Sequence, residues 1–215
     1  MEKDSSLNIA VGLVVFSIII SWFSVTFVNY IFVPYTSAAT SVTVTASITT
    51  TITCSTDIAT TAFGTLTSSA VATSTTNAST SISCVNSSAG CTLTVMDAGS
   101  GSNPGLWNST SSVIIGSSNA AYAASSTLVA GTVGYGVRAT TTTAGSGGTL
   151  GIAARYNTGL ANGLLGSAQD VGGLSITAIT LASSTATYDG REIIVTHKAA
   201  IASDTPGGNY NDTIT

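Results

Sequence analysis

Apolar and hydroxyl-bearing residues alternate along one early stretch of the chain. Between Val42 and Cys54 the sequence is VTVTASITTTITC. Successive side chains of a β-strand point to opposite faces, so this pattern predicts one long strand with an apolar face and a hydroxyl face. The residues expected on the inward, apolar face are Val42, Val44, Ala46, Ile48, Ile52 and Cys54.

Further stretches with strand character follow at irregular spacing, separated by clusters of Gly, Ser and Asn that predict turns and loops. Many short strands of this kind are typical of a sandwich or barrel. Single helical turns are expected at most at Asn119–Ala124 and Leu160–Leu165. We therefore expect an all-β domain. Its other predicted strands are Ser79–Cys84, Cys91–Met96, Val113–Ile115, Thr127–Ala130, Gly134–Ala139, Thr149–Tyr156, Ser175–Leu181, Glu192–Ala199 and Asn209–Thr215.

The chain before this domain is strongly apolar. No charged residue interrupts Leu7–Val33, which exceeds the roughly 20 residues that a membrane-spanning helix needs. A cleavable signal peptide has a basic start and a shorter apolar core, of about 7–15 residues, although the small residues Ser37–Ala39 offer a cleavage site. Three interpretations stay open: a retained anchor in membrane lipid, a cleaved signal, and a filament-core helix as in type IV pilins. We divide the chain into an N-terminal hydrophobic segment, 1–39, and a domain, 40–215.

The positions of the basic residues predict on which side of a membrane the domain lies. Lys3 precedes the apolar run, and the next basic residue is Arg138. Positive charge tends to stay on the cytoplasmic side. We therefore expect an exported domain at the cell surface or outside the cell.

The composition excludes several classes of function. Charged residues make up 7% of the chain, against about 25% in an ordinary soluble domain. Five Lys and Arg residues, in a chain of net charge −4, are too few for a nucleic-acid surface. Ser and Thr together fill roughly a third of the chain, and Thr keeps strand propensity while presenting a hydroxyl to water.

Candidate catalytic and metal-binding chemistry is sparse. A serine nucleophile needs a base, and His197 is the only histidine, within a predicted strand, so we expect a packed or surface side chain. The stretch Asp97–Asn103 lacks the repeated acidic positions and the final Glu of a calcium loop, which favours a turn. We predict no catalytic residue, cofactor or metal, and a protein that is not an enzyme.

Three cysteines, Cys54, Cys84 and Cys91, are each in phase with apolar neighbours in a predicted strand, so all three are expected to point inward. An exported domain can keep a disulfide. One bridge and one left-over thiol follow, and the sequence leaves three pairings open.

Four short segments carry a resemblance to a known family: Cys54–Asp57, Ala62–Thr65, Ser81–Cys84 and the ending Pro206–Thr215. They resemble the spore coat protein U and chaperone–usher pilin-like domain. Its members are immunoglobulin-like β-sandwiches that build secreted fibres or coats. The resemblance implies this fold over residues 40–215, a Cys54–Cys84 disulfide and an additional Cys91. Residues 98–175 and the N-terminal apolar segment depart from the family's pattern.

The function predicted from these features is that of a structural, adhesive subunit of an extracellular fibre, pilus or coat, whose main partner is a second copy of itself. The alternating segment 42–52 is either the first strand of a self-complete sandwich or a donor strand for another subunit's sheet edge. The alternative is a monomeric, membrane-anchored binding module. It would stack glycans on Trp107, Tyr135 or Tyr188, although core packing is the commoner role of such aromatics. Possible N-glycosylation sites are Asn77, Asn86, Asn108 and Asn211.

Overall fold

The computed structural model describes residues 13–18, 21, 45–58, 60–75, 78–118, 125–158 and 166–215. The chain divides into two compact units, Met1–Ala46 and Ser47–Thr215. In the first unit, residues 13–18 and 21 are helical. None of the helical residues described forms a helix long and apolar enough to span a bilayer. Most of Leu7–Val33, Val42, Val44, Asn77 and both predicted helical turns lie outside the described residues.

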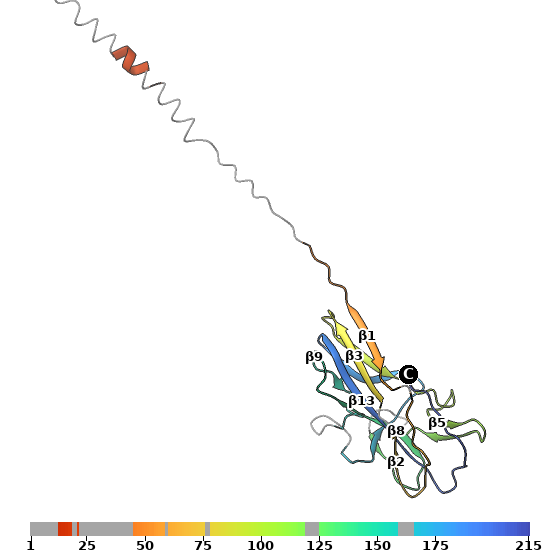
Figure 1. Ribbon diagram of the computed structural model, residues 1–215. Coiled ribbons are helices and arrows are strands. Elements are labelled where there is room, and N and C mark those ends of the chain that lie inside the picture. Colours follow the sequence, from red (N-terminus) through yellow and green to blue (C-terminus); the bar gives the residue numbers. More distant parts are fainter. Residues whose placement is uncertain are drawn as a thin grey trace, which may run out of the picture. The chain divides into compact units, whose positions relative to one another are not determined.

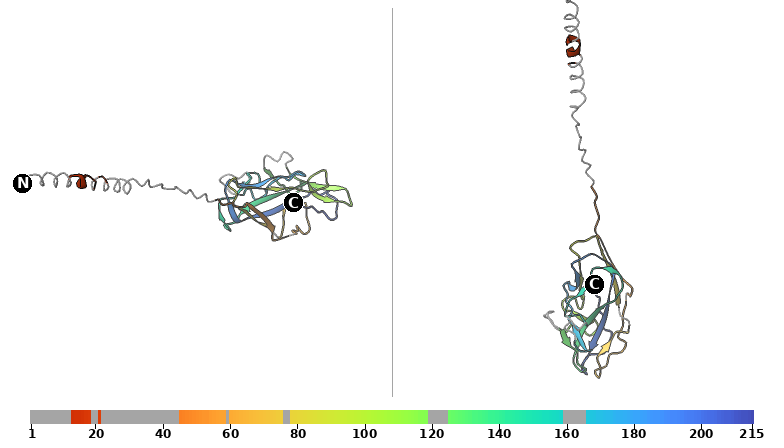
Figure 2. Two further views of the ribbon diagram at one scale, coloured as in Figure 1. Left: turned by 90° about the horizontal axis from the view of Figure 1, so that it is seen from above. Right: turned by 90° about the vertical axis from the view of Figure 1, so that its left-hand side faces the viewer.

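The second unit is all-β, as the sequence predicts, and its paired strands are antiparallel apart from two isolated bridges (Figures 1 and 2). Its strands are β1 (Thr51–Thr56), β2 (Ala72–Thr73), β3 (Ala78–Val85), β4 (Cys91–Val95), β5 (Gly105–Asn108), β6 (Val113–Gly116), β7 (Ser125–Thr127), β8 (Gly134–Thr141), β9 (Ser146–Gly147), β10 (Gly151–Ile152), β11 (Asp170–Gly172), β12 (Ile179–Ser184) and β13 (Tyr188–Ala200).

The strands form a large sheet, a small sheet and a hairpin. The large sheet has the order β1-β3-β13-β8-β11-β7, with β2 and β9 also paired to β13. The small sheet has the order β10-β12-β4, and the hairpin joins β5 to β6. One hydrophobic core contains residues of all three, including Val137 of β8, Leu181 of β12 and Ile115 of β6. The packing of these parts against one another therefore stabilises the unit.

β13 is the central strand of the large sheet. It pairs with β3 along one side, and with β8 in a continuous register from Ile193 opposite Thr141 to Ala200 opposite Gly134 along the other. Its apolar residues Ile193 and Val195 are buried. The predicted strand Glu192–Ala199 is therefore part of a central strand, β13, which pairs with a strand on each side.

The predicted first strand, Val42–Cys54, is wrong over most of its described part. Residues 45–50 lie outside any strand, and β1 begins only at Thr51. The side chains of Ile48 and Ile52 are 77% and 65% exposed, rather than buried. The reason is that β3, the strand paired with β1, ends at Val85 opposite Thr51, so residues before Thr51 extend beyond the sheet.

Four other predicted strands differ from what the structure shows. Ser175 Oγ accepts a hydrogen bond from the Thr177 N–H, so β12 starts later than Ser175. A turn closed by the Tyr156 N–H and the Ala153 carbonyl limits β10 to two residues. β7 ends at Thr127, and Asn209–Thr215 makes only isolated bridges. The predicted strands found largely as expected are those that became β3, β4, β6, β8 and β13.

Candidate functional site

A cavity of about 1330 Å³ lies between the two sheets. The inner faces of β8, β12 and β13 contribute Tyr135, Val137, Leu181 and Val195, all buried apolar residues. Its walls are Ile58, the segment 60–66, the edge strand β4 and the C-terminal segment 205–215. Small-molecule pockets typically measure about 300–1,000 Å³, so this inter-sheet cavity is larger than a small ligand needs.

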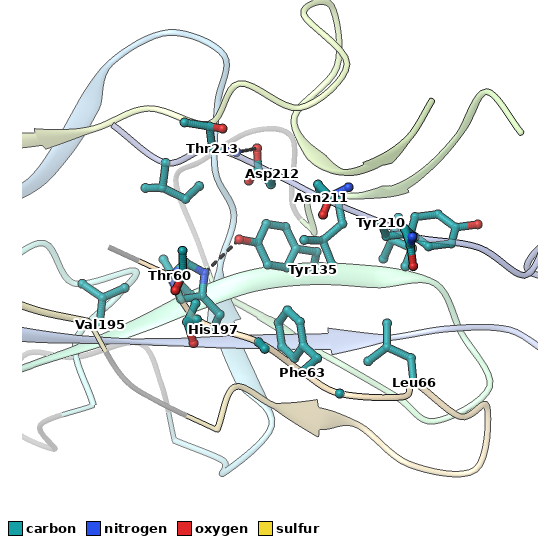
Figure 3. Close-up of a pocket in the computed structure, with 18 of the residues that line it drawn as sticks. Thr60, Phe63, Leu66, Tyr135, Val195, His197, Tyr210, Asn211, Asp212 and Thr213 are labelled. Carbon is teal, nitrogen blue, oxygen red and sulfur yellow. Dashed lines mark hydrogen bonds between the residues drawn. The ribbon is translucent and has the colours of Figure 1, made fainter. Parts of the chain in front are cut away.

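One polar pair lies among the apolar residues of the cavity. Tyr135 Oη and His197 Nδ1 are 2.8 Å apart, and their rings stack with centroids 6.0 Å apart (Figure 3). Phe63 meets the Tyr135 ring edge-on. Burial lowers the pKa of His197, opposed by the charge of Asp212. His197 is thus a buried, hydrogen-bonded side chain, which agrees with the expectation of a packed or surface histidine.

The edge of β4 that faces this cavity has no strand partner among the described residues. β4 pairs only with β12 and is the last strand of the small sheet. Just beyond it, Met96 donates its N–H to Thr215 and accepts the Thr215 N–H, at 2.7 and 2.8 Å. Main-chain groups of alternate residues point to the same side of a strand, so those of Thr94 and Thr92 face this same edge. The small sheet is therefore open along β4.

The C-terminal segment 209–215 forms one wall of the cavity. The Asn211 and Trp107 backbones exchange two hydrogen bonds, of 2.7 and 2.9 Å, and the Ala98 N–H donates to Thr213. The segment thus changes partners, from β5 at Asn211 to the extension of β4 at Thr213, which explains why it contains bridges instead of a continuous strand.

Two carboxyl groups meet beneath this segment. Asp97 is fully buried, and its Oδ1 accepts a hydrogen bond from the Gly105 N–H at 3.1 Å. Asp212 Oδ1 accepts from the N–H groups of Gly99 and Thr213, at 2.9 and 2.7 Å. Burial, reinforced by the neighbouring Asp212 carboxyl, raises the pKa of Asp97 to about 7. Asp97 therefore stays largely protonated in mild acid.

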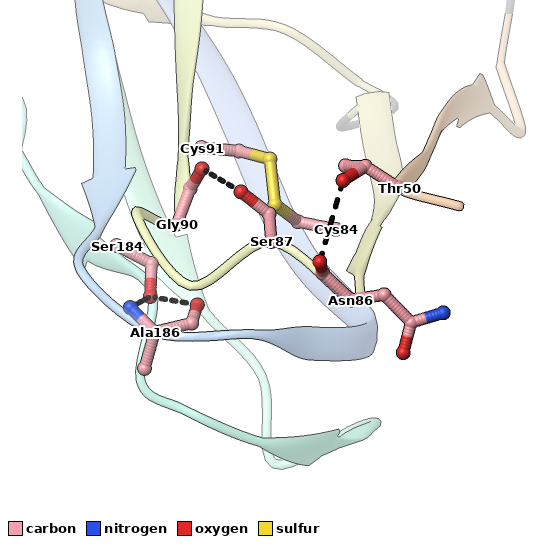
Figure 4. Close-up of a disulfide and its surroundings, with 8 residues drawn as sticks. All are labelled: Thr50, Cys84, Asn86, Ser87, Gly90, Cys91, Ser184 and Ala186. Carbon is pink, nitrogen blue, oxygen red and sulfur yellow. Dashed lines mark hydrogen bonds between the residues drawn. A yellow bond between two sulfur atoms is a disulfide. The ribbon is translucent and has the colours of Figure 1, made fainter. Parts of the chain in front are cut away.

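The disulfide joins Cys84 at the end of β3 to Cys91 at the start of β4, with Cα atoms 6.1 Å apart (Figure 4). The turn between them brings the two cysteines together, with Ser87 and Gly90 hydrogen-bonded to each other. Gly90 has a φ of 71°, and a Cβ there would lie 1.9 Å from the Ser184 carbonyl oxygen, so only glycine fits.

The Cys54–Cys84 pairing implied by the family resemblance is wrong. Across the β1–β3 ladder, Cys54 lies opposite Ile82, and Cys84 lies opposite Ile52. Cys54 is free and exposed beside the cavity, so the expectation that all three cysteines point inward also fails. β1 is an edge strand with every residue exposed. Sharing the parity of apolar neighbours therefore does not mean that a β1 side chain is buried.

The other predicted sites differ in accessibility. Asn86 and Asn211 are exposed, but Asn108 is 1% exposed and its Oδ1 accepts the Thr110 and Ser111 N–H groups, so Asn108 is no accessible glycan acceptor. Tyr135 and Tyr188 are each 2% exposed and cannot serve as stacking surfaces. Trp107 is half-buried in β5.

The inter-sheet cavity and the Asp97–Asp212 pair escape sequence analysis. The pair joins residues 115 positions apart in the chain, and the sequence pattern assigns Asp97 to a turn and Asp212 to a separate strand. The one available signal is that Asp97, two residues after β4, shares its parity with the apolar Leu93 and Val95.

Comparisons with known proteins give no relative: no protein-family model, curated protein or solved structure matches this chain.

Proposed function

We propose that this protein is a structural subunit of an extracellular fibre, pilus or coat, with an immunoglobulin-like, pilin-like fold, and that it polymerises by strand addition. The observation that carries the proposal is the inter-sheet cavity beside the unpartnered edge of β4. An added strand supplies main-chain partners for such an edge, and its alternate side chains fill the space below. The long apolar stretch Leu7–Val33 supports export.

The occupant we propose is residues 42–50 of a second copy. The described part of this segment has no strand partner, and Ile48 is 77% exposed. Val42, Val44, Ala46 and Ile48 share one parity, as a strand with one face in an apolar cavity requires. Ile52, in the same series, belongs to β1 and pairs with Cys84 of β3.

The segment of the same chain is directed away from this role by its contacts. Asn86 Nδ2 donates to the Thr49 carbonyl at 3.2 Å. Thr50 Oγ1 donates to the Asn86 carbonyl at 3.3 Å, as Figure 4 shows. Thr49 and Thr50 are thereby held at the end of β3, directly before β1. A second copy can reach the cavity without breaking these contacts.

The lengths also match. At about 3.3 Å per residue, an extended segment from Val42 to Thr50 spans about 30 Å, whereas the five residues of β4 span about 17 Å. The segment can therefore cover the whole open edge and still leave a short connection to its own subunit.

The test compares two exposed positions of opposite parity. Full-length wild-type protein, Ile48→Asp and Thr49→Asp are purified in detergent, the detergent is removed, and assembly is followed by sedimentation and negative-stain electron microscopy. We expect wild type and Thr49→Asp to form filaments and Ile48→Asp to remain unassembled, because the charge would enter the apolar cavity.

Two outcomes would overturn the proposal. Filaments of Ile48→Asp with the same yield as wild type would exclude this segment as the added strand and favour assembly through the N-terminal helix. A wild-type protein that stays monodisperse under all conditions would exclude the fibre and favour an anchored binding module.

A further inference from the structure

The Asp97–Asp212 pair lies where the C-terminal segment closes on the small sheet. The Met96–Thr215 ladder flanks the pair on one side, and the Ala98–Thr213 hydrogen bond flanks it on the other. Asp97 forms an isolated bridge with Ile214, and Asp212 lies two residues before Ile214 on the same face of the segment. Any event that pushes these carboxyl groups apart therefore acts directly on the attachment of the segment.

Two buried carboxylate oxygens of the pair have no hydrogen-bond partner among the described residues. Each Oδ1 accepts backbone N–H groups, whereas the Oδ2 atoms of Asp97 and Asp212 are both buried without a partner. A proton on Asp97 turns one of these two acceptors into a donor and satisfies the other. Without that proton, the fully buried Asp97 carboxylate is charged beside the half-buried Asp212 carboxylate, which is costly.

We propose that the Asp97–Asp212 pair is a proton-dependent latch, which fastens the C-terminal segment 209–215 over the inter-sheet cavity when one carboxyl is protonated and releases it when both are ionised. The chemistry is a reversible loss of one proton from a carboxyl group to water. Its consequence for assembly rests on the proposed function, because the released segment is a wall of the cavity that would receive the strand. The latch itself does not depend on assembly.

The other titratable groups that face the pair do not reproduce this behaviour. Tyr135 on β8 has its pKa raised well above its usual value by burial, so it stays neutral. His197 on β13 has its pKa lowered by burial and loses its proton at a lower pH than Asp97 does. Protonation of His197 in acid would moreover place a positive charge near Asp212, which does not mimic loss of the Asp97 proton.

The direction of the effect follows from proton linkage. Asp97 has a pKa of about 7 with the segment closed, and a value near the ordinary 3.8 once the segment opens into water. The closed form therefore binds more protons between these two values, so raising the pH favours opening. Between pH 5 and pH 8 the equilibrium constant for opening should rise about tenfold or more.

The experiment is hydrogen exchange of the full chain in detergent micelles, in the Ile48→Asp background so that filaments cannot hide amides. The reporters are the N–H groups of Met96, Ala98, Asn211 and Thr215, corrected for intrinsic exchange. We expect their protection to fall about tenfold or more from pH 5 to pH 8. The variant Asp97→Asn should show no such fall, because its amide keeps the acceptor for Gly105 and does not titrate.

A matched control removes the same charge elsewhere. Asp204 is exposed, so Asp204→Asn should keep the full pH dependence. A flat profile in the parent protein, or an equal dependence in Asp97→Asn, would overturn the latch. The profile of the parent protein alone decides the matter if Asp97→Asn does not fold. Assembly of Ile48→Asp after detergent removal would instead contradict the proposed function. Exchange is measured in detergent micelles, before assembly starts, so that outcome leaves the test of the latch intact.

Discussion

The main chains of Met96 and Thr215 exchange two hydrogen bonds, of 2.7 and 2.8 Å, at the point where the ladder of the C-terminal segment reaches β4. From this pair toward Cys91, the same edge of the small sheet has no strand partner among the described residues. The relationship fixes which main-chain groups an added strand would meet, namely those of Thr94 and Thr92.

Replacing Thr94 by proline should abolish strand acceptance and spare the fold. Proline removes an N–H that faces the open edge, and edge strands tolerate it. Thr94→Pro can still donate its segment 42–50 but cannot accept a strand. Ile48→Asp can still accept a strand but cannot donate one. Each variant alone should fail to assemble, and a mixture should form dimers and no longer species, measured by light scattering after size-exclusion chromatography. Filaments of Thr94→Pro alone would contradict acceptance at β4.

Loss of the disulfide should destabilise the β-domain. Closing the short loop between Cys84 and Cys91 is worth about 2–3 kcal/mol in the chain-entropy model. Cys91→Ser should lower the free energy of unfolding by about this amount, measured by denaturant titration without reductant. Cys54→Ser, which changes an exposed free thiol, is the control and should stay within about 0.5 kcal/mol of wild type. Equal effects of the two substitutions would contradict the observed pairing.

Alanine at Gly90 should cost more than alanine at Gly101. Both glycines have positive φ, 71° and 82°, but a Cβ at Gly101 would meet nothing within 4 Å. Backbone strain alone costs roughly 1–2 kcal/mol at either position. Overlap with the Ser184 carbonyl adds about 1–3 kcal/mol at Gly90. Thermal unfolding of the two variants measures the difference, and equal melting temperatures would show that the turn can shift.

The Tyr135–His197 hydrogen bond should contribute to stability through its polar atoms. Tyr135→Phe keeps the ring and its contact with Phe63, but leaves His197 Nδ1 buried without this partner. The expected loss is about 1–3 kcal/mol in the free energy of unfolding. Urea titration at pH 8 is the measurement, since His197 is neutral there. An unchanged midpoint would mean that another group satisfies the imidazole.

Stability should also depend on pH through Asp97. Its pKa is raised in the folded protein to about 7, from 3.8, so its contribution is fully present below pH 3.8 and is lost as the pH rises through 7. The lowered pKa of His197 acts in the opposite direction below pH 6.5. The difference between wild type and Asp97→Asn isolates the carboxyl. In thermal unfolding, wild type should lose stability relative to Asp97→Asn between pH 5 and pH 8, and a constant difference would be evidence against the raised pKa.

Sequence periodicity predicted the strands that are half-buried and paired within one chain. Glu192–Ala199 is the clearest example, because β13 has apolar contacts and partners on both sides. Val42–Cys54 has the same alternation, yet most of its described part lies outside the sheet. Alternation reports which side chains suit an apolar surface, and it does not say whether that surface belongs to the same molecule.

The candidate site was less predictable for a different reason. The cavity lies between strands that are far apart in the sequence. The edge of β4 is open because β12 pairs with its other side and the C-terminal segment pairs only with residues beyond its end. The Cys84–Cys91 pairing likewise depends on a turn that brings Gly90 against Ser184. Parity along single strands contains no information about these long-range choices.

The disulfide also determines how the subunit would carry a mechanical load. It ties β3 of the large sheet to β4 of the small sheet. In a fibre of the proposed kind, tension would enter at β1, pass across its ladder to β3, and leave through the strand held on β4. A covalent bond joins these two strands at the ends where β1 enters and β4 begins. The pull would therefore bypass the hydrophobic core, and the sheets would not need to resist separation by side-chain packing alone.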